Sequence, residues 1–514
     1  MERLLTAEPS HPAIIMALSG ETITHGRLEA RANKIAHLLR SAGLRRGDHC
    51  AVFMENHPRY VECGFGADRA GLYYTNVNSY LTPGELAYIL NNSLSQVLFT
   101  SQSHLAVARE ALRECSRVKL CVVVDGPGDG DVIRNLDQAT AAFPDTPIPD
   151  ESAGWAMLYS SGTTGQPKGI LRPLSDVPAR HMTPLAAAFA KFWDIRRNET
   201  CLVPAPLYHS APWASAALAI LLNGTAVIME RFDEEAALRA IEKNRVTYAQ
   251  FVPTMFSRML KLPLDVRARY DLSSLRYVLH GAAPCPIPVK QAMIDWLGPI
   301  VHEYYSATEG LGIAMCDSEQ WLAHKGTVGK AVYGEVHVLD AEMNELPPGA
   351  IGKLWFKTAY PFEYFNDPEK TAAANSSDRT MSTVDDIGYV DEEGFIHLTD
   401  RASFMIISGG VNVYPQECEN LLATHPKVRD SAVFGVPNEE MGEEVKAVVQ
   451  LMPNAKPGPE TEAELIAFCR EHLAHIKCPR SIDFEENLPR LPTGKLYKTG
   501  LRERYWQGHK SRIL

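Results

Sequence analysis

The sequence lacks the features that would assign the protein to a membrane or a fibre. Its longest apolar run, Ala214 to Leu222, is far shorter than the roughly 18 residues of a membrane span. No internal repeat or low-complexity tract is visible. The start at Met1 has no apolar segment typical of a signal peptide, and the C-terminal Ser-Arg-Ile-Leu is not the Ser-Lys-Leu peroxisomal address. We therefore expect a cytoplasmic protein without integral membrane association.

The chain also lacks an excess of positive charge. It has 51 Lys and Arg residues against 62 Asp and Glu residues, a formal net charge of -11, which disfavours binding to nucleic acid. The ten cysteines show no CxxC spacing, and the closest pairs are Cys115 with Cys121 and Cys469 with Cys478. We expect reduced thiols, no zinc cluster and no nucleic-acid partner.

What is present is a long chain with enough apolar residues for large cores. Its 514 residues, 45% of them hydrophobic, suit several domain-sized units or two unequal lobes. Thr24 can cap a helix that Gly43 would end, and the run from Ala214 to Leu222 is expected to be a buried helix. Strand-like runs alternate with amphipathic segments, which predicts α/β layers. These runs are Ala51 to Met54, Val97 to Phe99, Leu120 to Val124, Ala226 to Met229 and Tyr277 to Leu279.

The texture of the sequence changes near Gly352. Glycine, aspartate and aromatic residues then alternate, as in turns between short antiparallel strands. A second α/β alternation follows, with a strand at Ala432 to Val436 and a late helix opened by a capping box at Thr461 to Glu464. We predict an α/β fold with a large multi-layer N-terminal lobe, residues 1–401, and a smaller C-terminal α+β domain, residues 402–514.

A loop rich in glycine and hydroxyl groups follows the strand-like run from Trp155 to Tyr159. It reads Ser-Ser-Gly-Thr-Thr-Gly-Gln-Pro-Lys-Gly from Ser160 to Gly169. Glycines permit close backbone approach, hydroxyls donate hydrogen bonds and the lysine adds positive charge, so the segment suits a polyphosphate. Its spacing differs from a Walker P-loop, and Pro167 excludes a helix directly behind it. The alternative is a solvent-exposed turn.

The run from Tyr159 to Gly169 closely resembles the phosphate loop of the adenylate-forming superfamily. This superfamily includes acyl-CoA synthetases, firefly-type luciferases and peptide-synthetase adenylation domains. The resemblance implies a small β-barrel-like part in the large lobe and a mobile C-terminal domain. The segment after the loop, Ile170 to Pro173, departs from the family's usual Thr-His or Ser-His pair. The implied ATP-binding residues are Ser160, Ser161, Gly162, Thr163, Thr164, Gly165 and Lys168.

Two further segments resemble motifs of this family in the family's order. Tyr305-Ser306-Ala307-Thr308-Glu309 implies that Tyr305 stacks on adenine, Thr308 meets the α-phosphate and Glu309 holds Mg²⁺. The alternative is an ordinary helix-start Thr-Glu pair. Ser382 to Asp385 looks like Thr-Gly-Asp, with Val384 where the family has glycine, and implies that Asp385 binds the ribose. The other interpretation, an acidic turn facing solvent, fits Asp386 better than Asp385.

The segments around residues 400 and 490 resemble the moving parts of the same family. Asp400-Arg401 implies a ribose and phosphate contact by Arg401, and Ser403 stands at the hinge, where aspartate or lysine is common. Part of a coenzyme A channel is implied at Ser408, Gly409 and Gly410. The run from Leu488 to Lys495 resembles the family's terminal Pro-x-x-Gly-Lys loop. It implies that Lys495 is the catalytic cation bridging the carboxylate and the α-phosphate, with Thr308 and Glu309 completing the catalytic set.

The expected substrate is a hydrophobic carboxylic acid. The segment from Leu207 to Trp213 is apolar, with two aromatic rings and His209, which either orients the acyl group or is structural. Gly281, Ala282 and Ala283 resemble a strand end that lines the adenine and acyl pocket, where small residues leave space. We expect a ligase that uses ATP, Mg²⁺ and coenzyme A. An acyl-AMP ligase loading a separate carrier protein and a catalytically silent binding protein remain alternatives, and a homodimer is left open.

Overall fold

The computed structural model describes residues 7–160, 167–177, 181–358, 362–401, 404–408, 411–438, 441–490 and 496–507, without the side chains of Ser160, Leu185, Asp400, Arg401 and Asn412. The chain divides into two compact units. The first comprises Met1–Phe251, Leu262–Leu279 and Phe362–Ala373, and the second comprises Val252–Lys261, His280–Pro361 and Ala374–Leu514. The predicted domain boundary at residue 401 stays a prediction.

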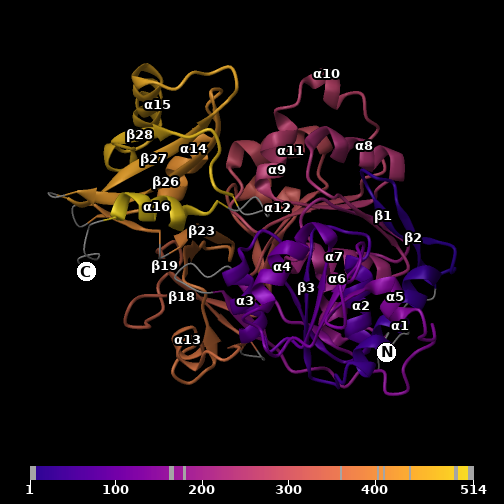
Figure 1. Ribbon diagram of the computed structural model, residues 1–514. Coiled ribbons are helices and arrows are strands. Elements are labelled where there is room, and N and C mark those ends of the chain that lie inside the picture. Colours follow the sequence, from indigo (N-terminus) through magenta and orange to yellow (C-terminus); the bar gives the residue numbers. More distant parts are fainter. Residues whose placement is uncertain are drawn as a thin grey trace. The chain divides into compact units, whose positions relative to one another are not determined.

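A parallel sheet of six strands forms one half of the first unit. Its order is β7-β6-β5-β3-β4-β8, and every adjacent pair is parallel. Helices connect these strands along the chain everywhere except between β6 and β7, so the predicted α/β alternation is confirmed here (Figure 1). The strands are β3 (His49–Phe53), β4 (Tyr73–Asn76), β5 (Val97–Thr100), β6 (Leu120–Val123), β7 (Ile133–Asn135) and β8 (Trp155–Ala156), and the helices are α2 (Tyr60–Arg69), α3 (Pro83–Asn92), α4 (Leu105–Leu112) and α5 (Leu136–Thr140).

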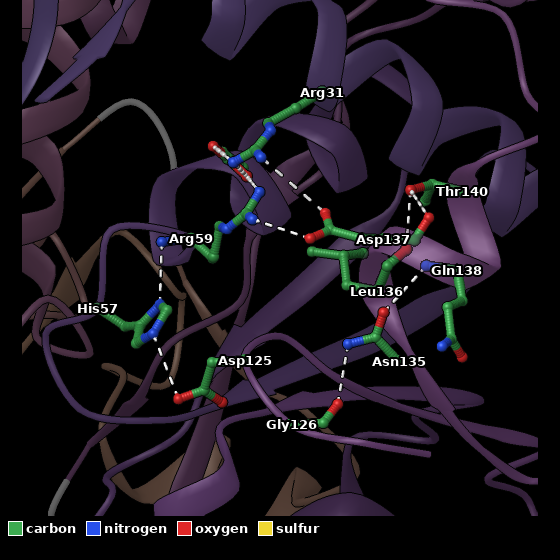
Figure 2. Close-up of polar contacts among 11 residues, drawn as sticks. Arg31, His57, Arg59, Asp125, Gly126, Asn135, Leu136, Asp137, Gln138 and Thr140 are labelled. Atoms are coloured by element: carbon green, nitrogen blue, oxygen red, sulfur yellow. Dashed lines mark hydrogen bonds and ion pairs between the residues drawn. The ribbon is translucent and has the colours of Figure 1, made fainter. Parts of the chain in front are cut away.

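Polar side chains pair with one another at the carboxyl end of this sheet (Figure 2). Arg59, just before α2, lies 3.2 Å from Asp137 of α5 and 3.1 Å from the buried carboxylate of Glu62. His57 Nε2 is 3.6 Å from Asp125 Oδ2. Ligands of open α/β sheets commonly bind at this end. Here the Arg59 guanidinium is paired with two carboxylates of the protein, and this ties the segment before α2 to α5.

The first unit also contains six neighbouring strands of a second sheet, in the order β14-β13-β11-β12-β1-β2. The cap at Thr24 is confirmed, because its hydroxyl accepts a hydrogen bond from the Arg27 N–H at 3.2 Å. Gly43 follows the helix with φ +89°, as predicted for a helix end. The elements are β1 (Pro12–Met16), β2 (Thr22–Thr24), β11 (Thr200–Val203), β12 (Thr225–Ile228), β13 (Tyr248–Phe251), β14 (Tyr277–His280), α1 (His25–Ser41), α6 (Pro184–Phe192), α7 (Ser210–Leu221), α8 (Glu234–Asn244) and α10 (Leu264–Arg267).

The second unit contains antiparallel strands in two groups before residue 402. Strands β15, β16 and β17 pair in sequence, while β18, β19, β22 and β23 form a sheet to which β21 adds. The short antiparallel strands predicted after Gly352 are therefore confirmed. The elements are β15 (Val301–Tyr305), β16 (Ile313–Cys316), β17 (Lys330–Tyr333), β18 (Glu335–Leu339), β19 (Gly352–Lys357), β21 (Met381–Ser382), β22 (Asp386–Val390), β23 (Ile396–Arg401), α9 (Pro253–Leu260), α11 (Ile287–Leu297) and α12 (Ser318–Ala323).

The C-terminal part of the second unit is built on one long hairpin, β26 (Val428–Asn438) with β27 (Gly442–Leu451). The predicted strand at Ala432 to Val436 lies within β26. The predicted capping box is wrong, because α15 begins at Pro459 and the Thr461 hydroxyl donates backward to the Lys456 carbonyl at 2.8 Å. The remaining elements are β24 (Ile406–Ser408), β25 (Val411–Val413), β28 (Ser481–Phe484), α14 (Pro415–Leu422), α15 (Pro459–His472) and α16 (Lys498–Trp506).

The predicted buried helix near Ala214 is α7, whose central residues Ala216, Ala219 and Ile220 are completely buried. Across the part of the chain that the structure describes, no helix combines the length and the apolar composition needed to cross a membrane.

Candidate active site

The glycine-rich loop lies between two paired strands. Ser161, Gly162, Thr163, Thr164 and Gly165 are outside the described residues, as is the side chain of Ser160. On either side of them, β9 (Tyr159–Ser160) and β10 (Lys168–Leu171) pair antiparallel. No helix follows directly, as the prolines predicted, because β10 continues as a strand and pairs with β20 (Glu363–Tyr364).

Lys168 stands at the start of β10. Its ammonium lies 4.7 Å from the centre of the Tyr364 ring, a cation–π contact that fixes the lysine beside the loop. The next residue, Gly169, has no room for a side chain, because an added Cβ would lie 2.9 Å from the Tyr159 ring. The Tyr159 hydroxyl is in turn anchored by donating to Asn92 Oδ1 at 2.6 Å. The strand ends that bracket the loop are therefore rigidly packed.

The segment from Tyr305 to Glu309 runs from a strand into a turn. Tyr305 ends β15, and Gly310 closes the turn with an N–H bond to the Ala307 carbonyl at 2.8 Å. The next helix begins only at Ser318, so the helix-start interpretation of Thr308-Glu309 is wrong. Glu309 is 7% exposed. Mg²⁺ bound with a nucleotide commonly needs only one or two protein carboxylates. A single carboxylate at this turn fits that chemistry, and no cluster of three or more metal-ligating side chains occurs among the described residues.

Asp385 and Asp386 have exchanged the environments expected from the sequence. The Asp386 side chain accepts a hydrogen bond from the Tyr305 hydroxyl at 2.7 Å, and the residue is 7% exposed. The Asp385 side chain is 62% exposed and pairs with Lys353 at 2.9 Å. The interpretation that Asp386 is the better candidate for solvent exposure is therefore wrong. Asp385 also has φ +64°, a conformation that glycine adopts more readily than other residues.

The strand end after His280 is packed at Gly281 and exposed at Ala282. A Cβ added to Gly281 would lie 2.5 Å from the Tyr304 ring, so no side chain fits there, and a role of Gly281 in lining the acyl pocket stays a prediction. Ala282 is exposed at φ +70°, and Ala283 is half-buried. His280 is completely buried, and burial lowers its pKa well below the usual value. The imidazole is therefore neutral near pH 7 and acts as part of the core.

We predict that Gly281→Ala destabilises the protein by about 1–3 kcal/mol, because the added methyl group overlaps the Tyr304 ring in a packed strand end. Urea unfolding at equilibrium measures the loss. The matched control is Gly84→Ala in α3, where nothing lies within 4 Å of the added Cβ and alanine favours the helix. Equal stability of Gly281→Ala and wild type would contradict the packing described.

The aromatic rings predicted to line an acyl pocket belong to the core of the first unit. Trp213 is 5% exposed and packs edge-on against Phe65 and Tyr74, with ring centroids 6.3 and 5.7 Å away. Tyr208 is also buried, with the His209 ring 4.3 Å away. His209 occupies the cap position of α7 without a side-chain cap bond. Its packing is structural, and an acyl-orienting role stays a prediction.

Several predicted site residues lie outside the described parts of the chain. These are Ser403, Gly409, Gly410, Lys495 and the side chain of Arg401. Ser408 is described, and it is buried at the end of β24, opposite Val411 and Gly442.

The segment that contains Lys495 has paired ends. Arg490 and Leu496 form an antiparallel bridge, and the Tyr497 N–H donates to the Pro489 carbonyl at 2.8 Å. The Arg490 guanidinium also forms a bidentate ion pair with the Asp430 carboxylate of β26. Sequence analysis did not identify this pair, since its partners are 60 residues apart.

A buried ion pair joins α11 to β15, and the sequence did not predict it. The Lys290 ammonium of α11 lies 2.5 Å from the Glu303 carboxylate, and their side chains are 0% and 5% exposed. Lys290 also lies 5.1 Å from the centre of the Trp321 ring. Lysine and glutamate are almost never fully buried unless paired, so neither residue suggests a core position from sequence. Glu303 precedes Tyr305 by two residues, so the pair anchors the strand that leads to the candidate site.

Comparison with known proteins identifies two family models along the chain. The model of the AMP-binding enzyme family matches residues 1–363, and that of the AMP-binding enzyme C-terminal domain matches residues 417–495. Together they cover most of the chain in the order predicted from its motifs.

Individual relatives match over nearly their full length. A feruloyl-CoA synthase of Amycolatopsis is 32% identical, covering 97% of this chain and 97% of the relative. The fatty acid–[acyl-carrier-protein] ligase ScoC of Streptomyces coeruleorubidus is also 32% identical, covering 97% and 94%. Among solved structures, ATP-bound MatB from Rhodopseudomonas palustris matches with a TM-score of 0.80 at 27% identity, covering 98% of this chain and 97% of that chain. The mixed α/β architecture is therefore the one predicted.

Proposed function

This chain belongs to the AMP-binding enzyme family, and from that premise we propose that it is an ATP-dependent acid–thiol ligase. It activates a hydrophobic carboxylic acid as an acyl-AMP with release of pyrophosphate, and then transfers the acyl group to coenzyme A. The observation that carries the proposal is the hydrogen bond from the Tyr305 hydroxyl to Asp386. Tyr305 precedes the buried residue Glu309 by four positions. The hydrogen bond brings together the two segments predicted to hold the nucleoside.

The nucleotide is assigned to residues from several segments. The loop from Ser160 to Gly165, together with Lys168, holds the phosphates, because its amides, hydroxyls and ammonium all present positive partial charge. Tyr305 stacks on adenine while its hydroxyl is held by Asp386. We assign the ribose hydroxyls to Asp386 in place of Asp385, since a carboxylate accepts from both groups of a diol. Arg401 contacts the ribose and a phosphate.

Charge compensation drives the first half-reaction. The substrate carboxylate attacks the α-phosphorus, and both reactants are anions, so their approach needs positive charge. Lys495 supplies it, Thr308 donates to the α-phosphate, and Glu309 would hold Mg²⁺, which neutralises the phosphates when it is bound. In the second half-reaction the coenzyme A thiol attacks the acyl carbon beside Ser408, Gly409 and Gly410, and AMP leaves. We propose that rotation of residues 402–514 exchanges the two arrangements.

We predict that Asp386→Asn raises KM for ATP about tenfold or more, because a charge-assisted bond to the ribose is lost. Asp385→Asn is the matched control, since that side chain is exposed and paired with Lys353, and its KM should stay within about twofold. Initial rates of pyrophosphate release at varied ATP measure both. The reverse order would return the ribose role to Asp385.

The acyl acceptor of the second half-reaction is either coenzyme A, as proposed, or a carrier protein. ScoC, which is named for loading an acyl-carrier protein, favours a carrier-loading ligase as the alternative. The decisive experiment is a pyrophosphate-release screen over fatty, aromatic and steroidal acids, with and without coenzyme A. A coenzyme A ligase should form AMP and a thioester only when coenzyme A is added. Sustained AMP formation with a carrier protein alone would establish the alternative, and no release with any acid would contradict the ligase.

A further inference from the structure

Two thiols face each other in the core of the C-terminal part of the chain. Cys418 lies on α14 and Cys469 on α15, and their Sγ atoms are 3.9 Å apart. The two residues are 1% and 0% exposed. Their helices pack over the β26–β27 hairpin, in one hydrophobic cluster with Leu422 and Leu465. No side chain separates the two sulfur atoms.

A third cysteine of the same cluster is engaged elsewhere. The Cys478 thiol donates to the carbonyls of Leu473 and Ala474, at 3.7 and 3.5 Å. Structural zinc sites need four ligands. No group of three or more His, Cys, Asp and Glu side chains suitable for a metal is found in the described ranges, so these thiols are not a zinc site. Cys418 and Cys469 therefore form a pair of facing thiols, and Cys478 does not take part in that pair.

The contact between the two thiols also makes them chemically unequal. The hydrogen bond between the two thiols lowers the pKa of Cys469, whereas the same bond and burial raise the pKa of Cys418. The thiolate is the nucleophile in sulfur chemistry. Either thiol of the pair can supply the attacking thiolate, and the direction of the pKa shift favours Cys469.

We propose that Cys418 and Cys469 form a redox-dependent disulfide that ties α14 to α15. In the first step the Cys469 thiolate attacks a hydroperoxide, its O–O bond breaks, and a sulfenic acid and an alcohol, or water, result. In the second step the Cys418 thiol attacks the sulfenic sulfur and releases water. Overall two thiols and one hydroperoxide give one disulfide, one alcohol and one water, with the thiols oxidised by two electrons.

The position of the pair defines what the disulfide does. The cysteines are 51 positions apart in sequence, so the bond closes a loop that contains the whole β26–β27 hairpin. Closing a long loop restricts the unfolded chain and stabilises the folded domain. Both thiols are buried, so oxidation requires transient opening of α14 or α15. We therefore expect the disulfide to form slowly. Once formed, it should resist the separation of α14 from α15.

The test treats the purified full-length protein with hydrogen peroxide, blocks free thiols in denaturant, and maps peptides by mass spectrometry without reductant. We expect a peptide pair joined through Cys418 and Cys469, lighter by two hydrogens, that dithiothreitol separates. The oxidised protein should show a melting temperature higher by about 3 °C or more. Sulfinic acid at Cys469 without a crosslink, or a crosslink through Cys478, would overturn the proposal. A crosslink with unchanged melting temperature would overturn its stabilising role.

Single-cysteine variants show which of the three thiols form the disulfide. Cys478→Ser should still form the crosslink, whereas Cys418→Ala and Cys469→Ala should not. The wild-type peptide map is decisive by itself if a core variant fails to fold. A disulfide-linked peptide pair that still forms in Cys418→Ala through Cys469 and is separated by dithiothreitol would contradict the assignment.

Discussion

Lys495→Ala should lower the rate of acyl-AMP formation by about two orders of magnitude or more, the size expected for one preorganised charge in a transition state. The reason is the repulsion between the substrate carboxylate and the α-phosphate, which only a cation at that point relieves. The measurement is acid-dependent exchange of labelled pyrophosphate into ATP, which reports the first half-reaction alone.

The second half-reaction distinguishes a catalytic lysine from a structural one. Thioester formation from supplied acyl-AMP should survive in Lys495→Ala, because the sulfur attacks a neutral acyl carbon and not the anionic α-phosphate. Lys477→Ala is the control, since Lys477 belongs to the same C-terminal part and forms an exposed pair with Glu417 at 2.6 Å. It should leave both rates within about twofold. An equal fall of both half-reactions in Lys495→Ala would show that the lysine assignment is wrong.

Lys290→Met should lower the free energy of unfolding by about 3–5 kcal/mol, because it leaves the Glu303 carboxylate buried without its cation. The double variant Lys290→Met with Glu303→Leu should recover most of that loss, since it removes both charges and fills the space with apolar atoms. Equilibrium urea unfolding measures all three proteins. Lys427→Met, in an exposed pair with Glu464, is the control and should cost less than about 1 kcal/mol.

The loss in Lys290→Met should also depend on pH. Burial already raises the pKa of Glu303 above its ordinary 4.5 in the wild-type protein, and removal of Lys290 raises it further. The folded protein then binds a proton more tightly than the unfolded chain, so stability falls as pH rises above 4.5. Lys290→Met should therefore be less destabilised at pH 5 than at pH 8. A loss independent of pH would mean that Glu303 is not the buried charge responsible.

The family of this protein follows from its sequence alone, because short segments carry it. The loop from Ser160 to Gly169 is recognised by glycines, hydroxyl residues and a lysine that are close in sequence, so the prediction of a phosphate loop depends on their spacing alone. The helix capped at Thr24 and the strands of the parallel sheet are likewise local, since they depend on periodicity and caps. These predictions needed no knowledge of distant contacts.

The environments of individual residues were decided only by tertiary structure. From sequence, Asp385 and Asp386 are two adjacent carboxylates, and only the folded chain places one against Tyr305 and the other against Lys353. The close approach of the Tyr304 ring to Gly281, which leaves no room for a side chain there, also depends on the folded chain. The same holds for Lys290 with Glu303 and for Cys418 with Cys469, whose significance lies in which partner each one meets. Short-range patterns determine backbone and family, whereas burial and pairing depend on segments that meet only when the chain is folded.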